Sequence, residues 1–298
     1  MRLAAIDIGS NAARLLITDV VKTPGAKPDF NKLNLVRVPL RLGFDVFEHK
    51  RILPAKEQMI INTLFAYKYL LKVYEVTYYK ACATSAMRDA ENAPAILARV
   101  KEETGIDIEV ISGDEEASVI YENHVAEKLN VANAYLYIDV GGGSTELTLF
   151  SNNQIAFKKS FDIGTIRLLK NQVQESKWLY VKDTIKEKTR TFKNLVAIGS
   201  GGNINKIFSL SKKKDGKPLS LELLKDYHKE FSNFSVYERM RMYDLREDRA
   251  DVIVPALLIF INVMRWADVS EIFVPKIGLA DGLIQHLYQQ LRLREIEV

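Results

Sequence analysis

Two stretches of the chain, residues 4–17 and 134–150, share one order of residue types. Each has an apolar run that leads to an aspartate (Asp7 or Asp139), then an apolar residue, a glycine, a small polar loop and a second apolar run. Apolar runs bounded by glycine and polar residues are typical of buried strands. Each stretch is therefore predicted to form a β-hairpin with a carboxylate near its tip. Two such hairpins at half-chain spacing predict a duplicated domain whose loops face each other across a cleft, and two unrelated hairpins are the alternative.

The loop of the second hairpin carries three consecutive glycines, Gly141 to Gly143, followed by the hydroxyl residues Ser144 and Thr145 and by the carboxylate of Glu146. Consecutive glycines weaken a strand and increase its entropy cost, so they are favoured where another group must approach the backbone closely. The N–H groups of such a loop form an anion-binding nest. The loop is therefore predicted to bind phosphate, with a flexible turn as the alternative.

Composition indicates an ordinary globular protein with a sizeable core. The 298 residues suffice for one large or two medium domains, and 47% are hydrophobic and 27% charged. The net charge of +4 suits a polyanionic ligand without requiring one. Cys82 is the single cysteine, so no intramolecular disulfide can form, which favours a reducing compartment. Because Cys82 lies in an apolar run, it is predicted to be a core residue and not a nucleophile. No signal-type segment precedes the first strand, and the longest apolar run, residues 252–264, is too short to span a bilayer. We therefore expect a cytoplasmic enzyme or binding protein.

The pattern of elements indicates two α/β halves, each of which begins with a hairpin and a third strand, residues 33–40 or 154–161, before helices and strands mix. The boundary is predicted near residue 124. This gives domains 1–124 and 125–298, with the last helix packing back on the first domain.

Three other segments predict an anion-binding loop, a capped helix start and a long buried helix. Gly199-Ser200-Gly201-Gly202-Asn203 joins a short strand to a helix, an arrangement that places an anion at a helix N-terminus, although connecting loops often contain glycine. Asp114 and Glu115 are predicted to be ordinary caps of a helix that begins near Ser112, whereas the local sequence leaves Glu116 unassigned. Residues 246–268 are predicted to form one buried helix with a kink at Pro255.

Taken together and in order, these motifs resemble the exopolyphosphatase / guanosine pentaphosphate phosphohydrolase (Ppx/GppA) family. The matching stretches are residues 6–11 with Arg14, 83–90, 112–117 and 139–146, with weaker matches at 199–202, 249–253 and 278–283. The resemblance implies two ribonuclease H-like domains of the superfold shared by actin, sugar kinases and heat-shock chaperone ATPases, with the site in the cleft between them. It also implies the short form of the family, without an additional C-terminal helical domain.

The resemblance also implies roles for single residues. Glu116 matches the catalytic base, and Asp139 and Glu146 match the carboxylates of the site and of its divalent metal, Mg²⁺ or Mn²⁺, with Asp7 as a further metal ligand. The phosphate-binding set consists of Gly9, Ser10, Asn11, Arg14, Arg88, Gly141, Gly142, Gly143, Ser144, Thr145, Gly201, Gly202 and Arg249. Two positions depart from the family pattern: Ala12 replaces a frequent hydroxyl residue, and Asn203 stands where the family usually has threonine.

The predicted function is exopolyphosphatase, which hydrolyses the terminal phosphoanhydride of inorganic polyphosphate and releases orthophosphate. This reaction needs a positioned water, charge neutralisation and an in-line leaving group. Guanosine pentaphosphate 5′-phosphohydrolase is the alternative with the same chemistry. An ATP-dependent kinase of the same superfold and a non-catalytic polyphosphate-binding or actin-like protein are alternatives of other classes. The expected partner is the phosphate substrate, with no membrane and no specific nucleic acid, and the resemblance suggests a homodimer.

Overall fold

The protein was analysed as a computed structural model that describes residues 1–22, 27–121, 133–152, 154–275 and 278–296. The chain divides into two compact units, the first made of Met1–Asn123 with Gly278–Val298 and the second of His124–Ile277. The last helix, α13 (Leu279–Ile296), packs on β1 and β2 and so belongs to the first unit.

The first unit is built on a mixed sheet with strand order β3-β2-β1-β4-β5. The first three strands are antiparallel neighbours, and β4 and β5 run parallel to β1. Their bounds are β1 (Arg2–Ile8), β2 (Ala13–Val21), β3 (Asp29–Val38), β4 (Tyr78–Ala83) and β5 (Glu109–Val110). Every residue of β1 after Arg2 is buried, because helices cover both faces of the sheet.

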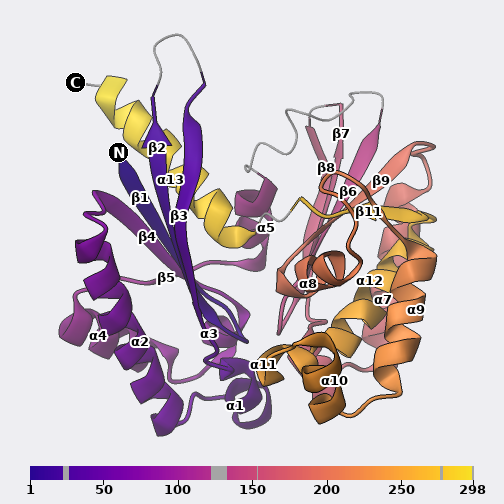
Figure 1. Cartoon of the computed structure of the whole chain (residues 1–298), viewed down its shortest axis with the longest axis horizontal. Helices are drawn as coiled ribbons and strands as arrows, with labels where there is room; N and C mark the ends of the chain where they lie inside the picture. The colour runs from indigo at the N-terminus through magenta and orange to yellow at the C-terminus, as the bar shows by residue number, and fades with distance from the viewer. Residues whose placement is uncertain (23–26, 122–132, 153, 276–277, 297–298) are drawn as a thin grey trace. The chain divides into compact units, whose positions relative to one another are not determined.

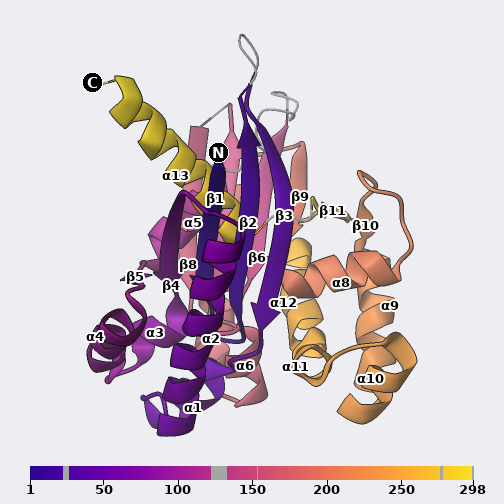
Figure 2. The same ribbon diagram turned by 60° about the vertical axis from the view of Figure 1, so that its left-hand side comes forward.

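The helices of this unit follow from their apolar spacing. They are α1 (Leu42–His49), α2 (Pro54–Val73), α3 (Ser85–Asp89), α4 (Ala93–Thr104) and α5 (Gly113–Tyr121). Proline at the first position starts α2, and Gly105 with φ of 75° ends α4. Figures 1 and 2 show α2 on one face of the sheet and α13 on the other, where α13 shares a core cluster with Leu3, Leu16 and Cys82.

The second unit repeats this plan around a sheet of order β10-β11-β9-β6-β7-β8. Its strands are β6 (Ala134–Val140), β7 (Thr145–Ser151), β8 (Gln154–Phe161), β9 (Leu195–Ser200), β10 (Leu219–Ser220) and β11 (Glu271–Phe273). The antiparallel set β6-β7-β8 with β9 parallel to β6 matches β1-β2-β3 with β4 in the first unit. The predicted α/β duplication is therefore confirmed.

The helices of the second unit are α6 (Thr165–Leu169), α7 (Glu175–Thr189), α8 (Gly202–Leu210), α9 (Leu221–Ser232), α10 (Val236–Tyr243), α11 (Glu247–Ala250) and α12 (Ile253–Trp266). The predicted single helix over 246–268 is wrong, since α11 and α12 are separate. Pro255 lies in the first turn of α12, where its missing N–H breaks no helical hydrogen bond, so it starts a helix and does not kink one.

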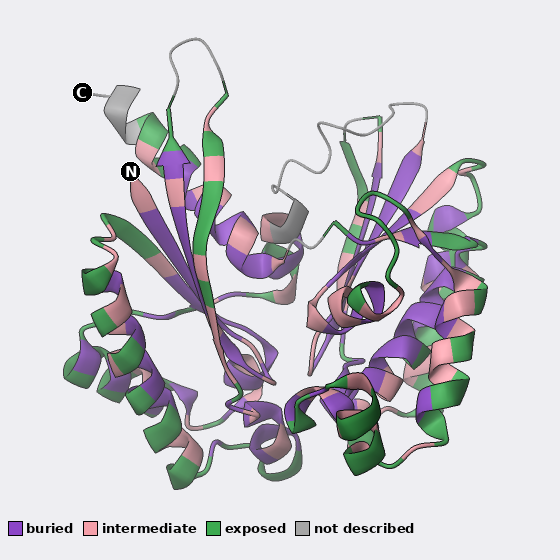
Figure 3. Ribbon diagram, in the orientation of Figure 1, coloured by how far each residue is buried: buried purple, intermediate pink, exposed green. Residues whose placement is uncertain are grey.

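The core of the second unit centres on α12, which is buried along most of its length and contacts α6, α7, α8, α9 and β6. Figure 3 shows this helix largely purple beside the greener outer helices α9 and α10. Among the described residues, no helix combines the length and the apolar character needed to cross a bilayer.

A close helix contact in the first unit generates a stability prediction. A Cβ added to Gly282 of α13 would overlap the backbone carbonyl of Val119 in α5, whereas a Cβ on Gly278 would meet open space. Gly282→Ala should therefore lower the free energy of unfolding by about 1–3 kcal/mol, the usual cost of overpacking. Gly278→Ala should leave it within about 0.5 kcal/mol of wild type, as for an unstrained surface change.

Urea unfolding followed by far-UV circular dichroism compares the two variants under identical conditions. Equal stability of Gly282→Ala and Gly278→Ala would contradict the close packing of α13 on α5.

Candidate active site

The tips of the two predicted hairpins close in the same way. The Gly9 N–H donates to the Ala12 carbonyl over 3.0 Å, and the Gly141 N–H donates to the Ser144 carbonyl over 2.9 Å. Gly9 and Gly141 were both predicted to bind phosphate. Since each uses its N–H to close the turn, each shapes its loop without offering that N–H to a ligand.

The carbonyl groups of the first loop are bound by the start of the helix that follows β3. The Ser10 carbonyl accepts from the Gly43 N–H over 2.8 Å, and the Asn11 carbonyl accepts from the Arg41 N–H over 2.9 Å. Arg41 adopts a left-handed conformation with φ of 53°, which aims its N–H at the loop at some cost in backbone strain. Residues about 30 positions along the chain thus fix the loop.

The second loop has the same support from α6, the helix that follows β8. The three glycine carbonyls each accept one hydrogen bond: Gly141 from the Thr165 N–H (3.0 Å), Gly142 from the Ile166 N–H (2.8 Å) and Gly143 from Arg167 Nε (2.7 Å). Gly164 makes this contact feasible, because any Cβ there would overlap the Gly142–Gly143 backbone. Neither Gly164 nor Arg167 was predicted from the sequence to take part in the site.

This support determines the direction of the loop N–H groups. In a trans peptide the C=O and N–H bonds point to opposite sides of the chain. The peptide units whose carbonyls face α6 carry the N–H groups of Gly142, Gly143 and Ser144, so these three N–H groups point away from α6. Within the described residues, none of the three donates a hydrogen bond. The loop therefore presents three donors to whatever occupies its other side, as an anion-binding nest does.

Two hydroxyl groups of the loops have partners within the protein. The Thr145 hydroxyl donates to the Ile163 carbonyl over 2.5 Å, and the Ser10 hydroxyl is 2.8 Å from that of Ser85 at the start of α3. Thr145 and Ser10 are both buried. Their side chains therefore stabilise the loops from inside, and the phosphate-binding role expected for them stays a prediction.

Two carboxylates lie next to the second loop on one face of the sheet. Asp139 on β6 is directly opposite Glu146 on β7 and beside Ser200 on β9, and cross-strand partners point to the same face. Ser160 on β8 donates its hydroxyl proton to Glu146 Oε1 over 2.7 Å. A Cβ on Gly201 would be 2.9 Å from Asp139 Oδ1, so the loop after β9 also reaches this carboxylate.

Two arginine–carboxylate pairs of the first unit join residues that were predicted to belong to the site. Arg14 Nη1 lies 2.7 Å from Asp7 Oδ2, across the β1–β2 pair. Arg88 Nη1, from α3, lies 3.2 Å from Oε2 of Glu116 on α5 and also donates to the Ile111 carbonyl over 2.7 Å. Glu116 is 8% exposed, so its carboxylate is buried and paired.

The neighbouring acidic residue has a different role. The Glu115 carboxylate accepts from the Ser112 N–H over 2.7 Å, and the Ser112 hydroxyl accepts from the Glu115 N–H over 3.1 Å. This reciprocal pair is a capping box, which confirms the capping role predicted for Glu115. The local sequence predicted the capping role of Glu115 but did not show that Glu116 is buried and paired with Arg88.

Comparison with known proteins assigns the family. The model of the Ppx/GppA phosphatase family matches residues 22–291. The chain belongs to this family.

Individual relatives agree with this assignment. Exopolyphosphatase 2 of Mycobacterium tuberculosis is 33% identical over 172 residues, which cover 56% of this chain and 53% of the relative. A guanosine-5′-triphosphate,3′-diphosphate pyrophosphatase of Vibrio parahaemolyticus is 26% identical and matches 98% of this chain and 60% of its own. The crystal structure of an exopolyphosphatase from Cytophaga hutchinsonii superposes with a TM-score of 0.83 at 25% identity and 98% coverage of both chains. The chain thus spans little more than half the length of the two curated relatives named here.

The residues of this Ppx/GppA chain fit a divalent metal to a limited degree. The described residues contain no cluster of three or more His, Cys, Asp or Glu side chains that could hold a metal. Asp139 and Glu146 form a pair of carboxylates on adjacent strands, and Mg²⁺ commonly binds through one or two carboxylates while keeping several waters. Asp7, the third predicted ligand, lies in the first unit and is paired with Arg14.

The glycine loop after β9 is in contact with Arg249. Gly201 has φ of 98°, a conformation that favours glycine. The guanidinium of Arg249 lies against Gly202, where an added Cβ would come within 2.5 Å of it, and Arg249 Nη1 donates to Asn203 Oδ1 over 2.6 Å. Asn203 thus supplies an acceptor that holds Arg249, a contact that was not predicted from the sequence.

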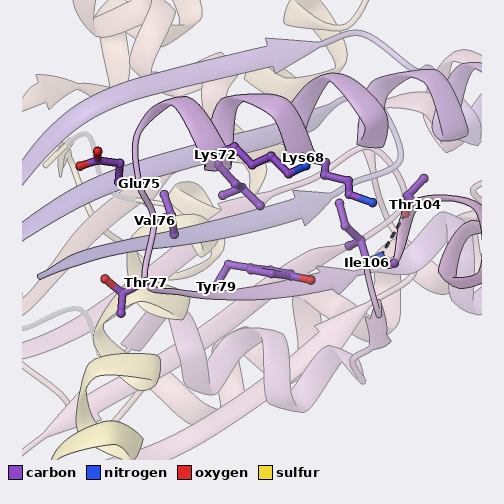
Figure 4. A pocket seen from close by; sticks show the side chains of 10 residues that line it. Lys68, Lys72, Glu75, Val76, Thr77, Tyr79, Thr104 and Ile106 are labelled. Carbon is purple, nitrogen blue, oxygen red and sulfur yellow. Dashed lines mark hydrogen bonds between the residues drawn. The ribbon is translucent and has the colours of Figure 1, made fainter.

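A separate cavity of about 330 Å³ lies in the first unit between the C-terminal ends of α2 and α4 (Figure 4). Its lining includes Lys68 and Lys72 of α2, Tyr79 near the start of β4, and Thr104. Arg88, a predicted site residue, follows the opposite, C-terminal end of β4, and none of the residues that line the cavity is a predicted site residue.

The buried thiol generates a prediction on reactivity. Burial raises the pKa of Cys82 to about 12. A raised pKa disfavours the reactive thiolate, and burial also keeps reagents away from the thiol. DTNB at pH 8 should therefore modify Cys82 only after the protein is unfolded in guanidinium chloride, with one thiol per chain. Rapid modification of the folded protein would contradict the core role of Cys82.

Proposed function

We propose that this protein is an exopolyphosphatase that removes the terminal phosphate of inorganic polyphosphate as orthophosphate, with Mg²⁺ or Mn²⁺ as cofactor. The observation that carries the proposal is the set of outward N–H groups of Gly142, Gly143 and Ser144 beside two carboxylates. Membership in a phosphatase family and the similarity to an exopolyphosphatase of Mycobacterium tuberculosis support it.

Glu116 is the proposed base. In hydrolysis the oxygen of a water molecule forms a bond to the terminal phosphorus, the bridging P–O bond breaks, and the shortened chain leaves with the electron pair. The carboxylate of Glu116 takes the proton of that water. Arg88 holds this carboxylate in place through its 3.2 Å contact, while its second hydrogen bond to the Ile111 carbonyl fixes the guanidinium itself.

Charge neutralisation is the second requirement. Asp139 and Glu146 are the proposed ligands of the divalent metal, which would offset the negative charge on the transferring phosphoryl group when bound. The loop N–H groups and the guanidinium groups of Arg14, Arg88 and Arg249 are the proposed phosphate contacts. Arginine suits this role because its planar fork binds phosphate oxygens in pairs.

The second candidate substrate is guanosine pentaphosphate, which carries the same terminal phosphoanhydride. The similarity to the Vibrio parahaemolyticus pyrophosphatase, which covers 98% of this chain, favours it. Both candidates would be served by the same residues. We further propose that the protein acts in the cytoplasm on the phosphate substrate, without a membrane or specific nucleic acid as partner, and the family resemblance suggests a homodimer.

The test compares two adjacent glutamates. Glu116→Gln removes the proposed base and should lower the rate of orthophosphate release from polyphosphate by about 10²- to 10⁴-fold. Glu115→Gln is the matched control, because glutamine also serves in a capping box, and it should keep the rate within about two-fold of wild type. Phosphate release is measured with Mg²⁺ and with Mn²⁺ on short and long polyphosphate, guanosine pentaphosphate and ATP.

Each outcome separates one hypothesis from another. A Glu116→Gln enzyme as fast as wild type would exclude Glu116 as the base. Faster turnover of guanosine pentaphosphate than of polyphosphate would favour the second substrate. Tight binding of polyphosphate without turnover would show a binding protein, and phosphorylation of an acceptor by ATP would show a kinase.

A further inference from the structure

The two units differ in the donors that bind the carbonyl groups of their hairpin loops, and Arg167 is the side chain that makes the difference. In the first unit both bound loop carbonyls accept from backbone N–H groups, those of Gly43 and Arg41. In the second unit two carbonyls accept from backbone N–H groups, but the Gly143 carbonyl accepts from the Nε of Arg167 over 2.7 Å. One position of the second loop therefore depends on the identity of a side chain.

Burial makes this use of arginine costly. Arg167 is only 9% exposed, on a short helix whose neighbour Ile166 is fully buried and which packs on α12. Arginine is almost never buried unless its charge and donors are used, because removing a cation from water is unfavourable. An apolar side chain would be the cheaper residue at this position if packing alone mattered.

The bond also acts on the ligand side of the loop. The Gly143 carbonyl and the Ser144 N–H belong to the same peptide unit and point in opposite directions. A charged donor on the carbonyl polarises this unit, which makes the Ser144 N–H a stronger donor. It also prevents the glycine peptide from rotating, a motion that three consecutive glycines would otherwise permit.

We propose that Arg167 is a positioning residue of the phosphate-binding loop: through the Gly143 carbonyl it holds the N–H groups of Gly142, Gly143 and Ser144 toward a phosphoryl group. This inference rests on the proposed function, since it assumes that the loop binds phosphate. Arg167 acts through the loop and does not itself contact the substrate.

The test follows the loop amides directly. The wild-type chain is labelled with ¹⁵N-glycine, and the Gly142 and Gly143 amide signals are followed during titration with tripolyphosphate without divalent metal. Arg167→Ala should weaken the affinity read from these signals by about 10- to 100-fold, as expected for loss of a hydrogen bond to a charged group. Arg265→Ala, an exposed arginine on α12, is the matched control and should bind like wild type.

A second readout separates positioning from a general loss of structure. Guanidinium at low millimolar concentration can enter the space left by Arg167→Ala, and it should restore part of the lost affinity without affecting Arg265→Ala. Arg167→Lys keeps the charge but not the planar Nε donor, so its affinity should fall between wild type and Arg167→Ala. It also serves as the test variant if Arg167→Ala does not fold.

The outcomes distinguish this inference from the proposed function. Tripolyphosphate affinity equal to wild type in Arg167→Ala or Arg167→Lys would overturn the inference and leave the exopolyphosphatase proposal intact. Absence of any response of the Gly142 and Gly143 amides in wild type would also overturn it. A third outcome is that the amides respond in wild type, the tripolyphosphate affinity falls in the variants, and the protein releases no phosphate. This outcome would support the positioning role of Arg167 and refute the enzymatic proposal.

Discussion

The direction of the loop peptides is the constraint on which the site depends. A peptide unit has two polar ends that point opposite ways, so the group that binds the carbonyl also decides where the N–H points. In this protein the helix that follows the third strand of each unit binds the carbonyls of the preceding hairpin loop. Since these peptides are anchored before any ligand arrives, the loop donors need little reorganisation to bind an anion, which is the advantage of a preorganised site.

The two units share the same strand arrangement but carry different side chains at the predicted site. The first unit pairs its site carboxylates with arginines, Asp7 with Arg14 and Glu116 with Arg88. The second unit places Asp139 and Glu146 on adjacent strands, with a serine hydroxyl on Glu146. Arg88 positions the carboxylate of Glu116, the proposed base, and the neighbouring carboxylates of the second unit suit a cation. The two units therefore contribute different groups to the proposed reaction.

Much of this arrangement was predictable because it is local in the sequence. The hairpins, the glycine loop and the adjacency of Asp139 and Glu146 follow from short apolar runs and the tight turn between them. The support of the loop was not predictable, because Gly164 and Arg167 lie about 20 residues beyond it in the sequence and meet it only when β8 pairs with β7. A glycine directly before a short helix after the third strand was the available signal. Pro255 was misassigned because a proline at a helix start and a proline kink have similar sequence patterns.

The central claim is that the loop of the second hairpin binds phosphate through its N–H groups while α6 holds its carbonyls. A crystal structure of the protein with tripolyphosphate bound tests this most directly. The account predicts phosphate oxygens within hydrogen-bond distance of the nitrogens of Gly142, Gly143 and Ser144, with the three glycine carbonyls still on α6 and Arg167. A phosphate bound elsewhere, or a loop whose carbonyls have turned away from α6, would contradict it.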